Sequence, residues 1–517
     1  MFDLLIKNAR IVDGSSSPWY RGDVAIENGK IAAIGKFGSE TSHKSVDAKD
    51  KYLAPGFIDI HSHSDSSIVE YSLAESRILQ GVTTEIAGNC GMSVFPILED
   101  KRKLLEQYND GQDFPWQSTA DFFAFVKKNR TSVNFASLVG HGSLRLAAMG
   151  AGNGEATEKD IKRMQDLLRE CMGQGALGMS SGLIYPPGFY SNTHELVEVA
   201  SVLKETGGYY ATHMRGEGTT LVPSVEEALE TARRSGVPLQ ISHHKCSERS
   251  GWYVSVKTTV AMIEKARMEG VNVMCDQYPY QASATSLTTQ VSDWAFEGGV
   301  EAMLERLKNP ASRARLKEEA NHTPAYRWPN LYISYVKTEK NSFAVGKSIT
   351  EISEIWGKDL IDTVFDLILE EEGQVGQISF GMCEEDIEFI MKQSFTMIGS
   401  DGSAISLNYK GQPHPRYYAT FPRVIAHYCR DRKLFPLETA IQKMTSMPAA
   451  RAGFSDRGLI KAGMWADLVL FDFDTIKDTP TYKEPQKACD GILQVYVNGV
   501  LTAENGKHCG TKAGMVL

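Results

Sequence analysis

The chain has 517 residues, of which 42% are hydrophobic and 23% are charged. This composition indicates a globular protein with enough apolar material for a large core. The formal net charge of -9, without a cluster of lysine and arginine, argues against a nucleic-acid partner. No apolar stretch is long enough to span a bilayer, and the N-terminus lacks the pattern of a signal peptide. The eight scattered cysteines form no Cys-x-x-Cys pair, so we expect reduced thiols and a cytoplasmic protein without a membrane partner.

Short β segments occupy both ends of the chain. Residues 1–54 contain apolar runs separated by turns such as Asn28-Gly29, and Asn-Gly between such runs indicates a hairpin. Residues 451–517 likewise contain short apolar runs separated by turns, one of them at Asn498-Gly499. Because chain termini often lie close together, we expect the two ends to share one sheet in a small β-sandwich domain.

Residues 55–450 alternate between strand-like runs and helical patterns. Residues 158–169, for example, place apolar side chains at helical spacing. Such alternation predicts a parallel α/β architecture, and a (β/α)8 barrel suits this length. Residues 286–347 do not follow this alternation of strand-like and helical patterns. We interpret them as an insertion on a βα loop that forms a lid over the site, the alternative being a further barrel segment.

Polar residues of metal-binding type lie where the predicted strands end. They are His61, His63, Cys90, His213, His243 and Asp401. The carboxyl ends of barrel strands share one face, where enzymes of this fold keep their active sites. His61 and His63 are two residues apart, so on an extended chain they point to the same side. Imidazole, thiolate and carboxylate groups together suit zinc.

Several of these residues also have a structural interpretation. Cys90 could be a small buried hydrophobe, although it lies on a tight loop between Asn89 and Gly91 rather than on an apolar face. Asp401, flanked by glycines, could cap a turn or a helix. His244 adjoins His243 and points to the opposite face, which favours a structural role. The sequence leaves open whether His141 contacts and positions the metal ligands without binding the metal itself.

The motifs along the chain resemble one family when taken in order. They are Pro55-Gly-Phe-Ile-Asp-Ile-His-Ser-His-Ser-Asp65, Gly88-Asn-Cys-Gly91, Ser180-Ser-Gly-Leu-Ile-Tyr185, Ala211-Thr-His-Met-Arg-Gly-Glu217, Ile241-Ser-His-His-Lys245 and Gly399-Ser-Asp-Gly402. This combination resembles the N-acyl-D-amino-acid deacylases (D-aminoacylases) of the amidohydrolase superfamily. The likeness runs over nearly the whole chain and is weakest from 286 to 347.

The resemblance implies a zinc enzyme built on a (β/α)8 barrel. Zinc would be held tightly by Cys90, His213 and His243. A second, weaker metal position would use His61, His63 and Asp401, sharing Cys90. The implied reaction is hydrolysis of an N-acyl-D-amino acid, in which zinc polarises the amide carbonyl and lowers the pKa of the attacking water. Asp401 would act as general base and then as general acid.

The same likeness implies that Tyr185, Lys245 and Arg416 hold the α-carboxylate of the substrate. The same residue types are expected on physical grounds, because lysine or arginine beside a phenol donor can hold a carboxylate in one position. Relatives that prefer D-glutamate carry an extra arginine after the Tyr-Pro-Tyr segment, and residues 278–296 contain none. This departure favours neutral or apolar D side chains.

Two other functions compete with this interpretation. A cyclic-amide hydrolase, hydantoinase-like or dihydroorotase-like, would carry a carboxylated lysine on a middle strand, and the runs at 133–139 and 175–181 offer no convincing candidate. A non-catalytic scaffold derived from such an enzyme would have lost a ligand, whereas all six candidates are present. The sequence leaves the oligomeric state open.

Overall fold

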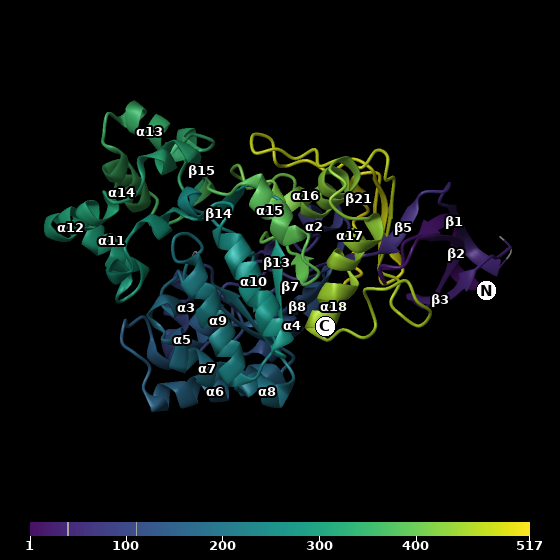
Figure 1. Ribbon diagram of the computed structural model, residues 1–517, viewed down its shortest axis with the longest axis horizontal. Helices are drawn as coiled ribbons and strands as arrows, with labels where there is room; N and C mark the ends of the chain where they lie inside the picture. The colour runs from purple at the N-terminus through teal and green to yellow at the C-terminus, as the bar shows by residue number, and fades with distance from the viewer. Residues whose placement is uncertain (39–40, 110) are drawn as a thin grey trace.

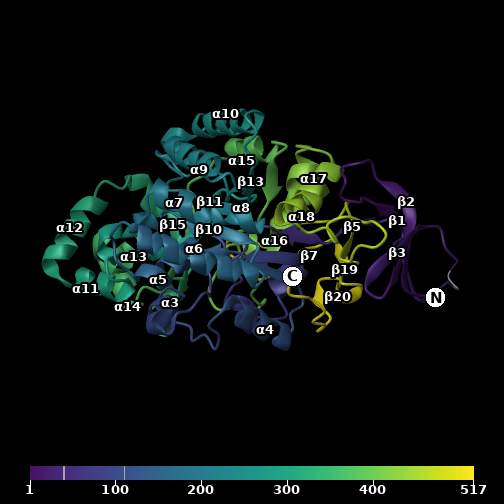
Figure 2. The same ribbon diagram turned by 90° about the horizontal axis from the view of Figure 1, so that it is seen from below.

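The computed structural model describes residues 1–38, 41–109 and 111–517. A barrel occupies the middle of the elongated molecule, with a sheet from the two chain ends on one side and a separate lobe on the other (Figure 1). The view from below shows the same order along the long axis (Figure 2). Within these ranges no helix has the length and apolar character needed to cross a membrane.

Parallel strands form the barrel. In chain order they are β6 (Phe57–Asp59), β7 (Val82–Ala87), β8 (Asn134–Ser137) continued by β9 (Val139–Gly140), β10 (Gly178–Gly182), β11 (Tyr209–His213), β12 (Leu239–Ile241), β13 (Val273–Gln277) and β17 (Thr396–Ile398). Neighbours pair in parallel from β6 to β8 and from β9 to β17. The ring closes where Asp401 N donates to His61 O at 2.8 Å and His63 N donates to Gly402 O at 2.7 Å. The predicted (β/α)8 barrel is confirmed.

Helices cover the outside of the barrel. The main ones are α4 (Thr119–Asn129), α5 (His141–Met149), α6 (Glu158–Gly173), α7 (Thr193–Ala200), α8 (Val202–Thr206), α9 (Leu221–Ser235), α10 (Ser255–Met268), α15 (Glu384–Met391), α16 (Arg416–Arg423), α17 (Leu437–Met444) and α18 (Ser446–Ala452). Helix α6 shows why such a segment forms a helix and packs against the barrel. Thr157 and Asp160 form a capping box at its start, and Ile161, Met164 and Leu168 are buried against the barrel.

The two chain ends share one sheet, as predicted. Its strands are β1 (Phe2–Ile11), β2 (Tyr20–Glu27), β3 (Lys30–Gly35), β4 (Ser42–Asp47), β5 (Tyr52–Pro55), β18 (Leu468–Phe471), β19 (Ile492–Val497), β20 (Val500–Glu504) and β21 (Lys507–His508). Antiparallel pairing of β5 with β18 joins the two ends, with Leu53 opposite Leu470. Both leucines belong to an apolar core of this sheet that is separate from the barrel core.

The chain leaves the barrel between β13 and β17 and forms a lobe that we call the lid segment, residues 282–380. Its elements are β14 (Ala282–Ser286), α11 (Val300–Lys308), α12 (Pro310–Ala320), β15 (Leu331–Val336), α13 (Ile349–Trp356), α14 (Leu360–Glu370) and β16 (Val375–Phe380). The three strands form an antiparallel sheet with β16 in the middle. Buried residues such as Met303, Ile352 and Phe365 give the segment its own core. The range 286–347 expected from the sequence covers only its first part, and α13, α14 and β16 lie beyond it.

Candidate metal centre and substrate site

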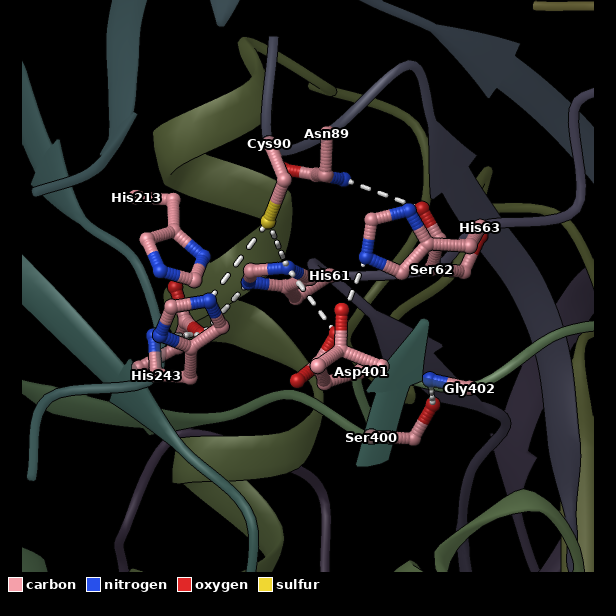
Figure 3. Close-up of polar contacts among 12 residues, drawn as sticks. His61, Ser62, His63, Asn89, Cys90, His213, His243, Ser400, Asp401 and Gly402 are labelled. Atoms are coloured by element: carbon pink, nitrogen blue, oxygen red, sulfur yellow. Dashed lines mark hydrogen bonds and ion pairs between the residues drawn. The ribbon is translucent and has the colours of Figure 1, made fainter. Parts of the chain in front are cut away.

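The six candidate ligands lie together at the carboxyl end of the barrel. His61 and His63 follow β6, Cys90 follows β7, His213 ends β11, His243 follows β12, and Asp401 follows β17. Figure 3 shows the Cys90 sulfur directed between the rings of His61 and His243, with Asp401 between His61 and His63. The ring centroids of His213 and His243 are 4.4 Å apart.

Four of these residues can offer ligands to a single ion. Cys90 Sγ lies 3.4 Å from His61 Nε2 and 3.5 Å from His243 Nε2. Asp401 Oδ1 lies 3.6 Å from His61 Nε2 and 2.9 Å from His63 Nε2. Ligand atoms of His61, Cys90, His243 and Asp401 all fall within 4.8 Å of one another. Nitrogen, sulfur and oxygen donors converging in this way suit a transition metal such as zinc.

A second group contains a carboxylate that the sequence analysis did not assign. His213, Glu217 and His243 also offer ligand atoms within 4.8 Å of one another. Neither ring nitrogen of the buried His213 has a hydrogen-bond partner among the described residues. Leaving such polar atoms buried and unpaired is costly, and a bound cation would remove that cost. The site therefore fits a metal, whereas the division of ligands between two positions stays a prediction.

The backbone is strained at three candidate ligands. Cys90, His243 and Asp401 have φ values of 51°, 34° and 51°, in a region that residues with a side chain rarely occupy. Such outliers concentrate at functional sites, where the surrounding structure holds them in place. Close packing fixes the Cys90 loop, because a Cβ on Gly182 would lie only 2.0 Å from Cys90 O. A glycine is therefore required at the end of β10.

The mutual electrostatics favour ionised ligands. Burial raises the pKa of the Cys90 thiol, but the imidazoles of His61, His243 and His63 more than offset this and hold the pKa well below its usual range. Burial likewise opposes ionisation of Asp401, whereas the charges of Arg416 and His243 keep its pKa well below the ordinary carboxyl value. A thiolate and a carboxylate are the forms that bind metal.

Two buried carboxylates orient the imidazoles. Asp276 Oδ1 lies 2.9 Å from His61 Nδ1, and Glu217 Oε1 lies 2.9 Å from His243 Nδ1. With Nδ1–H donating to a carboxylate, each ring turns its Nε2 toward Cys90. The sequence analysis missed both residues. A signal was available, since Asp276 follows a strand-like run directly and Glu217 comes four residues after a strand-end histidine.

The predicted carboxylate-binding residues lie beside the ligands. Lys245 Nζ is 2.6 Å from Glu217 Oε1, and Arg416 Nη1 is 2.9 Å from Asp401 Oδ2. Both cations lie against the ring of Tyr278, at 5.6 Å for Lys245 and 4.8 Å for Arg416. The ring of Tyr185 meets that of His213 with centroids 5.0 Å apart. Arg416 Nε is buried without an acceptor among the described residues, which leaves a donor for an anion.

A cavity of about 870 Å³ connects these groups with the lid segment. Cys90, His213, His243, Lys245 and Arg416 line it together with residues of β14 and β16. The volume is in the usual range for small-molecule sites. The site is thus formed jointly by the barrel and the lid segment.

Two further histidines lie outside the ligand group. His141 is fully buried and pairs with Glu195, with 2.9 Å between Nε2 and Oε1, away from the cavity lining. His244 contacts the Thr259 hydroxyl at 2.9 Å, and burial lowers its pKa to about 4. His244 has the structural role that its direction on the chain predicts, and the contacts of His141 are structural as well.

Comparison with known proteins agrees with this geometry. Residues 44–503 match the model of the amidohydrolase family. A D-aminoacylase of Alcaligenes xylosoxydans xylosoxydans is 37% identical over 100% of this chain and 97% of its own length. The chain belongs to the amidohydrolase family. An N-acyl-D-glutamate deacylase of the same organism is 34% identical, over 96% of this chain and 93% of that protein.

Solved structures extend the comparison. The crystal structure of a D-aminoacylase has a TM-score of 0.84 at 35% identity, with both chains fully covered. An N-acyl-D-glutamate deacylase from Bordetella bronchiseptica, complexed with zinc and a phosphonate inhibitor, has a TM-score of 0.84 at 32% identity and covers 100% of this chain and 99% of its own. These results confirm the predicted family, on its D-aminoacylase branch, the barrel fold and the assignment of a metal-dependent hydrolase.

Proposed function

We propose that this amidohydrolase cleaves the amide bond of N-acyl-D-amino acids, giving a D-amino acid and a carboxylate. The main support is one juxtaposition: a cluster of His, Cys and Asp side chains at the barrel mouth directly adjoins two buried cations, Lys245 and Arg416. An amide hydrolase needs a site that activates water, and a substrate with an α-carboxylate needs fixed positive charge close to it.

The metal ligands in this proposal are those of the sequence analysis, with zinc as the ion. Cys90, His213 and His243 hold the tight position, and His61, His63 and Asp401 form the weaker one. Bound zinc supplies a Lewis acid for the amide carbonyl and lowers the pKa of the attacking water. Glu217 and Asp276 keep the His243 and His61 rings turned toward Cys90 by contacts at Nδ1.

Asp401 is the proposed general base and then the general acid. Its Oδ1 points at the histidine cluster, 2.9 Å from His63 Nε2, while Oδ2 faces the Arg416 guanidinium. The carboxylate is ionised over the working pH range, as a base must be, because its pKa is held low. Taking the proton from water at Oδ1 and returning it to the leaving nitrogen restores the carboxylate for the next turnover.

Lys245, Arg416 and Tyr185 are the proposed partners of the substrate's α-carboxylate. Lys245 and Arg416 both contact the Tyr278 ring, so one aromatic side chain helps to hold both cations near the candidate ligands. The lack of an arginine in residues 278–296 supports substrates with neutral or apolar D side chains. The oligomeric state is left open, and a cytoplasmic location remains the expectation from the cysteine pattern.

Parallel assays test this proposal. The metal-loaded enzyme should hydrolyse N-acetyl-D-amino acids at a rate far above that for the L enantiomers. The cations fix the α-carboxylate and the metal fixes the amide group, so the two enantiomers place their side chains in different parts of the cavity. A hydantoin serves as the competing substrate. Ring opening of the hydantoin without cleavage of any N-acetyl-D-amino acid would assign the enzyme to the cyclic-amide hydrolases instead.

A further inference from the structure

Strands β14 and β16 of the lid segment contribute neutral hydrogen-bonding side chains to the cavity lining. In the lid segment, β14 pairs with β16 so that Ser283 lies opposite Ser379 and Thr285 opposite Gln377. Directly opposed residues of an antiparallel pair project from the same face. All four line the cavity. We call these four residues the polar face.

The polar face continues into a hydrogen-bonded amide and hydroxyl network. Gln377 Nε2 donates to Thr289 Oγ1 at 3.1 Å, and Gln377 Oε1 accepts from Gln290 Nε2 at 3.3 Å. Thr289 and Gln290 also line the cavity. The network holds the Gln377 amide in one orientation, and a fixed amide offers a defined donor and acceptor to a ligand.

The polar face adjoins the proposed carboxylate partners. Arg416 Nη2 donates to Ala284 O of β14 at 3.1 Å, and the Tyr185 hydroxyl lies 3.1 Å from Thr285 Oγ1. The α-carboxylate and the side chain of an amino acid are attached to the same carbon. The acyl group lies on the other side of the amide, toward the metal ligands. A carboxylate held by Arg416 and Tyr185 therefore brings the D side chain within reach of β14.

We propose that the polar face selects N-acyl-D-amino acids whose side chain carries an uncharged hydrogen-bonding group, an amide or a hydroxyl. This inference rests on the proposed function and narrows its substrate class. The Gln377 amide bonds to Thr289 and Gln290 but keeps a second N–H and a second lone pair for a ligand. An apolar side chain would cover these without making a hydrogen bond, and an unmade hydrogen bond of this kind discriminates strongly between substrates.

The cavity lining also contains apolar and charged groups. Met92 and Ile184 lie on the barrel loops that carry Cys90 and Tyr185, and Ala284 and Val375 lie on β14 and β16 themselves. The cations Arg327 and Lys410 line the cavity from segments outside these two strands. The four residues of the polar face are neutral, so they offer an acidic side chain no opposing charge.

Three substrates of similar shape test the proposal: N-acetyl-D-glutamine, N-acetyl-D-methionine and N-acetyl-D-glutamate. We expect kcat/KM for the glutamine compound to exceed that for each of the others by at least about tenfold. Gln377→Met should bring the glutamine-to-methionine ratio to within about threefold of one, and Thr285→Val should lower it in the same direction. Gln281→Met is the matched control, because Gln281 is exposed at the edge of the lid segment and outside the cavity lining.

Each outcome decides a separate point. Faster cleavage of the methionine or glutamate compound, or a glutamine-to-methionine ratio that both cavity variants leave unchanged, would overturn the polar-face inference while leaving the deacylase function intact. Cleavage of none of the three by the metal-loaded enzyme would overturn both. A Gln281→Met variant that shifts the ratio as much as Gln377→Met would also contradict the assignment to the polar face.

Discussion

Asp401 is the residue on which the proposed chemistry depends most. It contacts His63 and Arg416 at 2.9 Å each, through its two different oxygens. Its neighbours are charged and largely buried, so the carboxylate has little freedom to move away from the cluster. In the proposed mechanism this one side chain thus serves both as a metal ligand and as the proton carrier.

Replacing Asp401 with asparagine removes the base while keeping the shape of the side chain. We expect kcat to fall by about 10²–10⁴-fold, the usual contribution of a positioned acid or base. Zinc bound at the Cys90, His213 and His243 position should remain, because Asp401 is not one of those ligands. Metal analysis and turnover of the same preparation check both statements, and turnover at the parental rate would remove the role of Asp401.

Glu217 supports the site without being one of the predicted ligands. Its Oε1 lies 2.9 Å from His243 Nδ1 and 2.6 Å from Lys245 Nζ, and burial of Glu217 is outweighed by the charges of Lys245, His213 and His243, which keep its pKa low. Glu217→Gln should weaken metal binding by about 10–100-fold, since the carboxylate no longer fixes the His243 ring.

Competition with a metal chelator measures the effect of Glu217→Gln. Glu227→Gln is the control. Like Glu217, Glu227 is a half-buried carboxylate paired with a cation, in this case Arg215, but it lies outside the cavity lining. Equal metal affinity in the Glu217 variant, the Glu227 variant and the parent would contradict the orienting role of Glu217.

Strand β7 carries a second kind of buried acid. Glu85 is fully buried, its Oε2 accepts from Ser64 Oγ at 2.8 Å, and no described residue hydrogen-bonds to Oε1. Burial, reinforced by nearby Asp59 and Asp65, raises the pKa of Glu85 to about 7, although Arg77 acts in the opposite direction. The folded protein therefore keeps a proton that the unfolded chain loses above the ordinary glutamate value of 4.5.

The raised pKa of Glu85 predicts a pH-dependent loss of stability. Below about pH 4.5 the carboxyl is protonated in both states and has no differential effect. Between about pH 4.5 and 7 the free energy of unfolding falls as pH rises, and the loss levels off above that range at about 3 kcal/mol. Glu85→Gln should thus be more stable than the parent at pH 8 but not at pH 4.5. A difference in melting temperature that is the same at both pH values would contradict the buried acid.

The strands show which elements the sequence predicts well. The apolar and β-branched runs at 81–87, 209–213 and 396–401 predict strands, and β7, β11 and β17 begin within a residue of these starts. β10 has the sequence Gly-Met-Ser-Ser-Gly and lacks such a run. Its glycines are required by close backbone approach, as at Gly182 beside Cys90, so tertiary packing rather than local propensity decides this strand.

At the scale of the whole molecule, a prediction has to bring together segments that are far apart in the sequence. The positions of strand ends in the sequence predict that six candidate ligands share one barrel face, and the structure has all six there. The contacts of the lid segment could not be anticipated in the same way, because β14, β15 and β16 are separated by long helical stretches and their register is set by pairing. The polar face appears only once Thr285 and Gln377, 92 residues apart, are paired.

Metal dependence of stereospecific hydrolysis is the most direct test of the account. The protein is stripped with a chelator, reloaded with zinc, and assayed at each stage with matched N-acetyl-D- and N-acetyl-L-amino acids. The account predicts that hydrolysis of the D compounds disappears on stripping and returns on reloading, with little cleavage of the L compounds throughout. Equal rates for the two enantiomers, or full activity in the stripped protein, would contradict it.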